Sequence, residues 1–398
     1  MYKGALSGVT VVDLTRVLAG PYCSMLLADM GADVIKIELP GKGDDSRGHF
    51  PQVKGESAYY MNLNRNKRSM TLNLKSEEGK EIFRNLIRKA DIVLENYRPG
   101  VMEKLGLGYN ELKKINPGIV YGCVSGFGHY GPYSQRPGYD IIGQAMGGLM
   151  STTGWPGGEP TRSGTALSDV MGGVSLAVGV LSAYINKQKT GEGQMVDVAL
   201  VDSIVSTLEI INQIYLVTGR VPDRIGNRYE AAYPYDSFKA KDGSLVIGCG
   251  NDKLFKLLSA LMGQPELCED PRFYTNIKRV ENHEALKVIL EDWLKDYDTQ
   301  TAVQMILDAG VPAGPIYDIK QVTEDPHIAG AREMFVEIDH PVAGKMKITG
   351  NQIKLSATPV TYHDPAPLLG QHTDEILTEF LGMSADEIQK LKDKGNVF

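Results

Sequence analysis

The sequence predicts an α/β protein with a doubly wound, largely parallel sheet and a second, smaller α+β domain. Three observations support this prediction. Strand and helix signals alternate through the N-terminal third, which is typical of parallel sheets. A long apolar segment follows Asp169. The character of the chain changes near Gly219, where a loop-like stretch interrupted by Pro222, Gly226 and Pro234 begins.

The N-terminal third supplies the predicted sheet. Short apolar runs predict strands, and two of the intervening segments predict helices. The predicted strands cover residues 9–14, 32–37, 69–74, 91–94 and 119–124, and the predicted helices cover 21–30 and 76–89. Sheets of this kind bind ligands beyond the carboxyl ends of their strands, so we expect the functional site there.

The middle of the chain is rich in glycine and apolar residues. A Gly-rich and aromatic region, 125–158, precedes an apolar segment, 170–185, that has almost no polar face. Such a segment predicts a helix buried on all sides. An apolar run at 195–200 and one long helix over 202–217 are expected to follow.

The remaining segments predict the domain division. We expect a large-domain part over 1–224, a small α+β domain over 225–325 and a C-terminal part over 326–398. The small domain should contain a hairpin at 238–249, turning at 241–243, and helices at 252–262, 283–295 and 299–309. The C-terminal part resembles strand and loop until Ser384, where a capping box with Glu387 starts a final helix.

The composition is that of an ordinary globular protein. With 42% hydrophobic and 23% charged residues, the 398-residue chain is long enough for two domains. A net charge of −7 argues against a general nucleic-acid binder or a membrane-surface protein. Met1 to Gly4 run almost directly into a strand, leaving no room for a signal peptide, and no long uninterrupted apolar stretch predicts a membrane span. We expect a soluble, cytoplasmic protein.

Cysteine and histidine spacing argues against a metal site. The four cysteines are scattered without a C-x-x-C pair, at Cys23, Cys123, Cys249 and Cys268. The seven histidines include no H-x-x-x-H pair and no Cys/His cluster along the sequence. We therefore expect neither a metal enzyme nor a disulfide framework.

Asp169 is the residue around which the functional prediction is built. Unpaired N–H groups and the helix dipole favour an anion at a buried helix N-terminus, so we expect this carboxylate to be ionised at neutral pH and poorly solvated. Both properties suit a nucleophile that attacks an activated acyl group. The alternative is a plain helix cap, a position that Ser168 would fill equally well.

The segment Gly126–Gly131 formally matches the G-x-G-x-x-G dinucleotide fingerprint. That fingerprint requires a helix to open at once and an acidic residue about 20 positions later. A turn at 132–134 follows instead, and no such acidic residue closes a second strand. A nicotinamide or flavin site is therefore disfavoured, although an oxidoreductase stays an alternative.

Other polar residues gather near the predicted strand ends. The basic residues there favour a phosphorylated ligand as a group, although each alone is equally explained as solvated surface: Arg65, Lys67, Arg68, Lys75, Arg98, Lys104 and Arg136. Tyr139 and Asp140 lie in a turn, where they either orient a reacting carbonyl or make loop contacts. Gly248 and Gly250 either allow close backbone approach to a ligand or form a strand-to-helix turn.

A series of motifs runs in order along essentially the whole chain. They are Val12–Arg16, Ala19–Pro21, Gly31–Glu38, Asn66–Ser69, Leu72–Lys75, Glu78–Gly79, Glu95–Gly100, Ser125–Gly128, Gly131–Tyr133, Gly191–Gln194 and Pro367–Thr373. In this order they resemble the class III CoA-transferases of the CaiB/BaiF type, which include formyl-CoA transferase and carnitine CoA-transferase.

The resemblance implies roles for individual residues. Asp169 matches the family's catalytic aspartate, and Tyr139 and Asp140 match residues that line its site. The residues expected to bind CoA are Leu72, Asn73, Lys75, Asn96, Tyr97, Arg98, Lys104 and, from the basic group, Arg136. The resemblance also implies coenzyme A as part of an acyl-CoA substrate, no metal or redox cofactor, and an interlocked homodimer whose large domain is built from both chain ends.

Three departures argue against formate or oxalate exchange. Leu18 stands where formyl-CoA transferase has an active-site glutamine, and Leu39 replaces an arginine that contacts CoA there. The four-glycine run of that enzyme has no counterpart before Asn251. Residues 226–252 are more similar to members that pass CoA from succinyl-CoA to small dicarboxylates.

The predicted function is CoA transfer from an acyl-CoA to a small carboxylic or dicarboxylic acid through an aspartyl mixed anhydride and an enzyme–CoA thioester. Backbone N–H groups of the glycine loops would stabilise the oxyanions. Arg224 and Arg228 would receive a distal carboxylate unless they are surface residues. An α-methylacyl-CoA racemase is the main alternative, but Tyr139 replaces its histidine, and a phenol is a poor base at neutral pH. A CoA-binding protein without catalysis is a further alternative.

Overall fold

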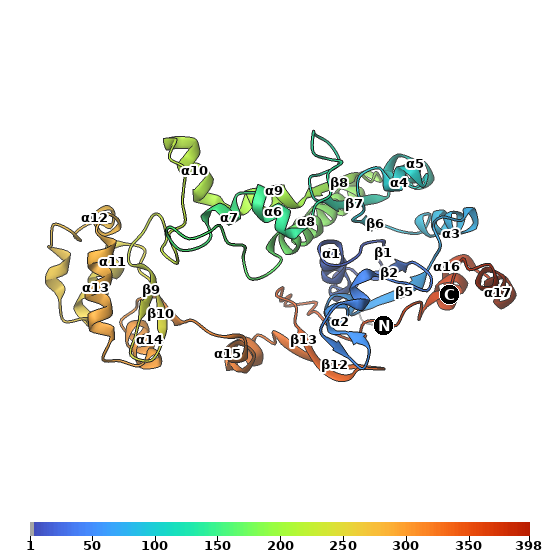
Figure 1. Cartoon of the computed structure of the whole chain (residues 1–398). Helices are drawn as coiled ribbons and strands as arrows, with labels where there is room; N and C mark the ends of the chain where they lie inside the picture. The colour runs from blue at the N-terminus through green and yellow to red at the C-terminus, as the bar shows by residue number, and fades with distance from the viewer. Residues whose placement is uncertain (1–3) are drawn as a thin grey trace. The chain divides into compact units, whose positions relative to one another are not determined.

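The computed structural model describes residues 4–398, which form two compact units (Figure 1). Unit 1 comprises residues 4–149, 162–218 and 329–398, and unit 2 comprises residues 150–161 and 219–328. Residues 1–3, on which the signal-peptide argument partly depends, lie outside the described part of the chain.

A six-stranded parallel sheet forms the centre of unit 1, so the predicted parallel α/β sheet is confirmed. Its strand order is β5-β2-β1-β6-β7-β8. The strands are β1 (Thr10–Asp13), β2 (Asp33–Glu38), β5 (Lys67–Thr71), β6 (Ile92–Glu95), β7 (Val120–Ser125) and β8 (Met195–Ala199). The chain winds outward in both directions from β1 and β6, so the topological switch point lies between these two strands.

Both faces of this sheet are buried, because successive side chains of each strand enter opposite cores. Val11 and Ile92 enter one core, whereas Val12 and Val93 enter the other. Helices α1 (Ala19–Asp29) and α8 (Leu167–Thr190) supply the first core. Helices α3 (Glu77–Ile87), α5 (Tyr109–Ile115), α16 (Thr373–Leu381) and α17 (Ala385–Asp393) supply the second.

Shorter elements complete unit 1. The helices are α2 (Ala58–Asn64), α4 (Val101–Lys104), α6 (Asp140–Met146), α9 (Leu200–Thr207) and α10 (Glu209–Thr218), with a 3-10 turn at Asp45–Gly48. Two small antiparallel pairs are β3 (Gln52–Val53) with β4 (Glu56–Ser57), and β12 (Phe335–His340) with β13 (Gly344–Thr349). Helix α7 (Leu149–Thr152) spans a boundary between the units. The predicted capping box of α17 is confirmed at Ser384 and Glu387.

The expectation that the helix after Asp169 is buried on all sides was wrong. In α8, the side chains of Val178 and Ile185 are 61% and 55% exposed. The helix is long and apolar enough to cross a membrane, yet one face of it packs against α1 and the sheet. Gly173 permits this contact, since a Cβ there would lie 2.5 Å from the carbonyl oxygen of Ala19.

The predicted single helix over 202–217 was also wrong. It is broken between α9 and α10, which are bent by 77°. The hydroxyl groups of Ser206 and Thr207 donate hydrogen bonds to the carbonyls of Ser203 and Ile204 at the break. Side chains that occupy backbone carbonyls in this way compete with the helical pattern.

Unit 2 is a small α+β unit. The predicted hairpin is confirmed as β9 (Tyr235–Lys239) with β10 (Ser244–Gly248), and β11 (Ala313–Pro315) completes the antiparallel sheet. The helices are α11 (Asp252–Leu261), α12 (Asn276–Glu281), α13 (His283–Leu294), α14 (Thr299–Asp308) and α15 (Ile319–Glu324). A 3-10 turn covers Pro265–Cys268, and a π-helical turn at Pro326–Ala331 spans the second boundary.

Candidate active site

A cavity of about 500 Å³ opens at the carboxyl ends of β1, β6 and β7. The loops after β1 and β6 line it on the two sides of the topological switch point, where open α/β sheets bind ligands. The lining residues are Arg16, Val17, Leu18, Ala19, Asp45, Asn96, Tyr97, Arg98, Pro99, Val101, Val124, Ser125, Gly126, Arg136, Pro137, Gly138, Tyr139, Asp169 and Leu200.

Asp169 lines this cavity from the first turn of α8. The N-cap is Ala166, so Asp169 is not the cap of its helix. No residue of the described chain donates a hydrogen bond to its carboxylate. A half-buried carboxylate without a partner is costly, which is typical of groups retained for chemistry.

Burial, and then the negative charge of Asp140, raise the pKa of Asp169 to about 7. The expectation that this carboxylate is fully ionised at neutral pH was therefore wrong. The helix dipole was expected to dominate, whereas desolvation and a second carboxylate oppose it. Near pH 7 the free protein holds Asp169 close to half-ionised.

The side chain of Asp140, on α6, caps the N-terminus of α8, a role that was considered for Asp169 and Ser168. Its Oδ1 accepts a hydrogen bond of 2.9 Å from the backbone N–H of Ser168, across from α6 to α8. Its Oδ2 accepts a bond of 2.8 Å from Nε2 of the fully buried Gln144. Gln144 also donates to the carbonyl of Thr165, so one side chain joins α6 to the loop before Asp169.

Two glycines let two loops meet at the cavity. A Cβ at Gly126 would lie 2.6 Å from Cα of Gly138, and a Cβ at Gly138 would lie 2.5 Å from Cα of Gly126. The backbones therefore touch, and this contact brings Tyr139 to the cavity. After β7 the next helix begins only at Asp140, so the dinucleotide fingerprint lacks its helix, as the sequence predicted.

A strained residue and a buried charge pair support the loop after β1. Val17 has a φ of 67°, in the left-handed region that a β-branched residue rarely adopts. The carboxylate of Asp44 accepts the Val17 N–H at 3.1 Å. Asp44 also forms a fully buried ion pair of 2.9 Å with Lys36, whose Nζ donates to the carbonyl of Thr15. Strain held by surrounding contacts is common at functional sites.

The structure brings half of the predicted site residues together at the cavity. The predicted residues that line the cavity are Leu18, Asn96, Tyr97, Arg98, Arg136, Tyr139 and Asp169. The sequence analysis missed Arg16, which is a third exposed cation at the cavity beside Arg98 and Arg136, and Ser125, whose hydroxyl-bearing side chain lines it. It also missed Tyr59, whose pKa is raised to about 12 by burial and by the nearby charge of Asp169.

Four predicted CoA-binding residues do not line this cavity. Leu72 is buried in the hydrophobic core, and Asn73 is engaged with the backbone of Lys75 and Asn396. Lys75 and Lys104 are exposed. Their role in binding CoA stays a prediction.

The basic residues that were expected, as a group, to bind a phosphorylated ligand fall into two sets. Arg65 and Lys67 are buried and pair with Asp29 and Asp13. Arg68 is held by Asp33, Glu375 and Glu379. These three do not belong to a ligand-facing basic group, and they are not solvated surface residues either, because carboxylates of the fold neutralise their charges. Arg98 and Arg136 remain exposed at the cavity.

Gly248, Gly250, Arg224 and Arg228 belong to unit 2. Gly248 lines a separate cavity of about 300 Å³ within that unit, beside Tyr235. Arg224 donates a hydrogen bond to the carbonyl of Ser151. Their roles toward a substrate stay predictions.

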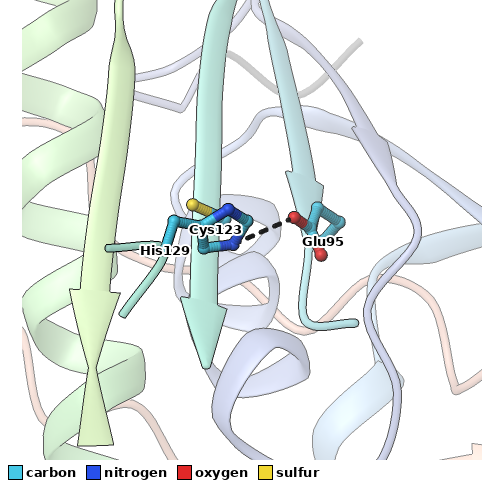
Figure 2. Close-up of side chains that lie close together, drawn as sticks. All are labelled: Glu95, Cys123 and His129. Carbon is cyan, nitrogen blue, oxygen red and sulfur yellow. Dashed lines mark ion pairs between the residues drawn. The ribbon is translucent and has the colours of Figure 1, made fainter. Parts of the chain in front are cut away.

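Cys123, His129 and Glu95 come together in space, although the sequence shows no Cys/His cluster (Figure 2). Glu95 ends β6, Cys123 lies in β7 and His129 follows β7. Burial raises the pKa of Glu95 to about 8. The five residues that separate Cys123 from His129 give no metal-site spacing, so only the fold reveals the group.

Comparison with known proteins identifies the family. The model of CoA-transferase family III matches residues 6–373. The chain belongs to CoA-transferase family III. The resemblance found in its motifs is thereby confirmed, and with it the identification of the chain as an enzyme of this class.

This family III CoA-transferase aligns with its relatives over nearly its whole length. It is 43% identical over 389 residues to acetyl-CoA:oxalate CoA-transferase of Acetobacter aceti, covering 96% of this chain and 97% of that protein. It is 40% identical over 392 residues to succinyl-CoA–D-citramalate CoA-transferase of Chloroflexus aurantiacus, covering 98% and 97%. The crystal structure of a CaiB/BaiF family protein from Brucella suis superposes with a TM-score of 0.82 at 40% identity, covering 95% and 99%.

Proposed function

We propose that this family III CoA-transferase moves CoA from an acyl-CoA, with succinyl-CoA as the candidate donor, to a small carboxylic or dicarboxylic acid, with Asp169 as the nucleophile. The observation that carries the proposal is the unpartnered Asp169 carboxylate beside the cavity at the switch point. A named relative uses succinyl-CoA and D-citramalate, and another uses acetyl-CoA and oxalate. A transfer assay with oxalate as the acceptor tests the prediction that Leu18 and Leu39 disfavour oxalate.

The proposed reaction retains the free energy of the thioester bond, because CoA passes from one acid to another and water hydrolyses no intermediate. A carboxylate oxygen of Asp169 attacks the thioester carbon of the donor, the C–S bond breaks, and CoA leaves as the thiolate. The thiolate then attacks Cγ of the aspartyl mixed anhydride, which releases the donor acid and forms an enzyme–CoA thioester. The acceptor carboxylate repeats these two steps in reverse and regenerates the Asp169 carboxylate.

The surroundings of Asp169 suit this sequence. Arg16, Arg98 and Arg136 supply positive charge along the cavity for the anionic ends of CoA. Backbone N–H groups of the 125–126 and 136–139 loops, which line the cavity, would stabilise the oxyanions. Burial makes the ionised Asp169 a poorly solvated and therefore reactive nucleophile.

We further propose a cytoplasmic, interlocked homodimer that needs no metal or redox cofactor for this reaction, and no membrane or nucleic-acid partner. Exposed apolar side chains support an oligomer, since Leu216 and Val217 of α10 are 71% and 78% exposed and Val178 lies on the open face of α8. Analytical ultracentrifugation gives the oligomeric state. A monomer at micromolar concentration would contradict the dimer.

The direct test is intact-protein mass spectrometry after mixing with succinyl-CoA, with and without hydroxylamine. We expect a CoA-sized or acyl adduct on Asp169, and its loss in Asp169→Asn. The matched control is Asp202→Asn, an exposed carboxylate in the first turn of α9. An adduct that persists in Asp169→Asn excludes the covalent role, and α-proton exchange of a 2-methylacyl-CoA in heavy water would indicate the racemase instead.

A further inference from the structure

Three potential metal ligands converge beside the cavity without lining it. Figure 2 shows the Glu95 carboxylate, at the end of β6, and the His129 imidazole, in the segment after β7, facing each other, with Cys123 of β7 beside the imidazole. One ligand atom from each lies within 4.8 Å of the other two. Oε1 of Glu95 and Nε2 of His129 are 3.6 Å apart, too far for a hydrogen bond.

The His129 imidazole has an unsatisfied nitrogen. Its Nε2 is buried and has no hydrogen-bond partner among residues 4–398. A buried polar atom without a partner is unfavourable, because it has lost its hydrogen bonds to water without replacing them. A cation bound between His129 and Glu95 would satisfy this nitrogen.

We propose that Glu95, Cys123 and His129 form a binding site for a zinc-like divalent transition-metal ion. The donor set of one thiolate, one imidazole and one carboxylate suits Zn²⁺ or Co²⁺ and not Mg²⁺ or Ca²⁺. With bonds of about 2.0–2.3 Å, tetrahedral ligands lie roughly 3.4–3.6 Å apart. The Glu95–His129 separation of 3.6 Å already has that value, and the ligand atom of Cys123 lies within 4.8 Å of both, so a movement of at most roughly 1 Å would complete the set.

Asp197 on the neighbouring strand β8 is placed to be a fourth ligand or to orient the others. Its Oδ1 lies 3.8 Å from Sγ of Cys123, and its Oδ2 accepts the backbone N–H of His129 at 2.9 Å. Tyr121 donates to Glu95 at 3.2 Å, and the backbone N–H of Tyr97 donates to it at 2.7 Å. Such outer contacts fix the direction of metal ligands.

Binding would be an exchange of a proton for the metal ion. The Cys123 S–H bond breaks and its proton leaves to solvent, as does the proton of the Glu95 carboxyl where that group holds one, while the sulfur–metal and oxygen–metal bonds form with no change of oxidation state. The ion would connect β6 to the segment after β7, whose neighbouring residues Asn96 and Gly126 line the cavity. We therefore expect it to hold these two loops together and to take no part in the acyl chemistry.

The test uses Co²⁺ as the probe on the chelator-treated, full-length protein. We expect one equivalent to bind with a thiolate-to-cobalt absorption band and the intense visible bands of tetrahedral coordination. Cys123→Ser should abolish the thiolate band, and His129→Gln should weaken binding by roughly 10–100-fold. Competition with Zn²⁺ should displace the cobalt.

The matched control is Cys268→Ser, which removes a more exposed cysteine of unit 2 and should leave the spectrum unchanged. Circular dichroism establishes that Cys123→Ser is folded, and His129→Gln provides a second variant outside the strand. A protein that shows no thiolate band, or a band that survives in Cys123→Ser, overturns the proposal. The readout does not depend on CoA transfer.

Discussion

The side-chain amide of Asn96 and the backbone of Arg16 exchange two hydrogen bonds across the switch point. Oδ1 of Asn96 accepts the Arg16 N–H at 2.8 Å, and its Nδ2 donates to the Arg16 carbonyl at 2.7 Å. The pair therefore joins the loop after β6 to the loop after β1. An amide in this position stabilises the cavity through the backbone, whether or not it also touches CoA.

Asn96→Asp should disrupt the contact between the two loops that line the cavity, although the two side chains have nearly the same size. Aspartate keeps the acceptor but turns a second acceptor toward the Arg16 carbonyl, at a cost of about 1–3 kcal/mol. We expect the KM for acyl-CoA to rise about tenfold or more, measured by steady-state transfer. Asn85→Asp, on the exposed end of α3, is the control, and an equal effect there would contradict the role of the pair.

The charge of Asp140 should set the pH dependence of the reaction. Asp169 acts as the carboxylate, so kcat/KM should rise with pH through its pKa of about 7. Asp140→Asn removes the second cause of that raised pKa, so the midpoint should move to lower pH. Asparagine also loses the bond from Gln144. Gln144→Leu loses the same bond but keeps the charge, and it should lower the melting temperature without lowering the midpoint.

Asp169→Asn should stabilise the protein while it abolishes transfer. The folded pKa of Asp169 is raised above the unfolded value, so the folding free energy of the wild type weakens as pH rises from about 4 through 7. Removing the charge should therefore raise the free energy of unfolding by about 2 kcal/mol at pH 8 and by almost nothing at pH 4, after allowing for the partial exposure of the side chain. Urea unfolding at the two pH values measures this. A gain that is equal at both would show that ionisation is not its cause.

Gly126→Ala should separate the two loops that touch at the cavity. The added Cβ meets backbone, which cannot rotate away as a side chain can. We expect a loss of at least about 100-fold in kcat/KM, because small misplacements of reacting groups are costly. Gly48→Ala is the control, since a Cβ there meets nothing within 4 Å. A fully active Gly126→Ala would mean that the loop contact does not position Tyr139.

Substitution of a predicted CoA-binding residue should weaken CoA binding to a degree that depends on whether the residue lines the cavity. Arg98→Ala and Arg136→Ala each remove a cation from the cavity, and a charge-assisted hydrogen bond is worth about 1.5–3 kcal/mol. We expect the dissociation constant of CoA, measured by calorimetry, to rise about 10–100-fold. Lys75→Ala and Lys104→Ala report whether CoA extends beyond this cavity. Larger effects for the lysines than for the arginines would place the nucleotide elsewhere.

The parallel sheet and the position of Asp169 could be predicted because they follow from local signals. Each central strand is an apolar run, and small residues precede one carboxylate at a helix start. Other features depend on contacts that spacing does not encode. The helix α16 begins without a side-chain cap, and α2 lies between two predicted strands, where no helix was predicted. Arg65 resembled a phosphate ligand until the fold placed Asp29 beside it.

The ionisation of Asp169 illustrates the same limit. The sequence indicates a helix N-terminus and hence a stabilised anion. The sequence does not indicate how closely Asp140 approaches Asp169 or how much solvent the fold removes from its carboxylate. These two effects outweigh the helix N-terminus and raise the pKa of Asp169. The Glu95–Cys123–His129 group is likewise a product of strand order, since β6 and β7 are neighbours only in the folded sheet.

The second core of the sheet has a consequence for biosynthesis. Its residues from β1, β2, β6 and β7 are completed by Ile376, Leu377, Ile388 and Leu391, far along the chain. During translation α3 and α5 emerge early and cover part of this apolar face, but the rest of it stays uncovered until α16 and α17 leave the ribosome. Contacts of such long sequence separation slow folding and favour aggregation of the unfinished chain. We expect chaperones that bind nascent apolar surface to engage this protein while it is being made.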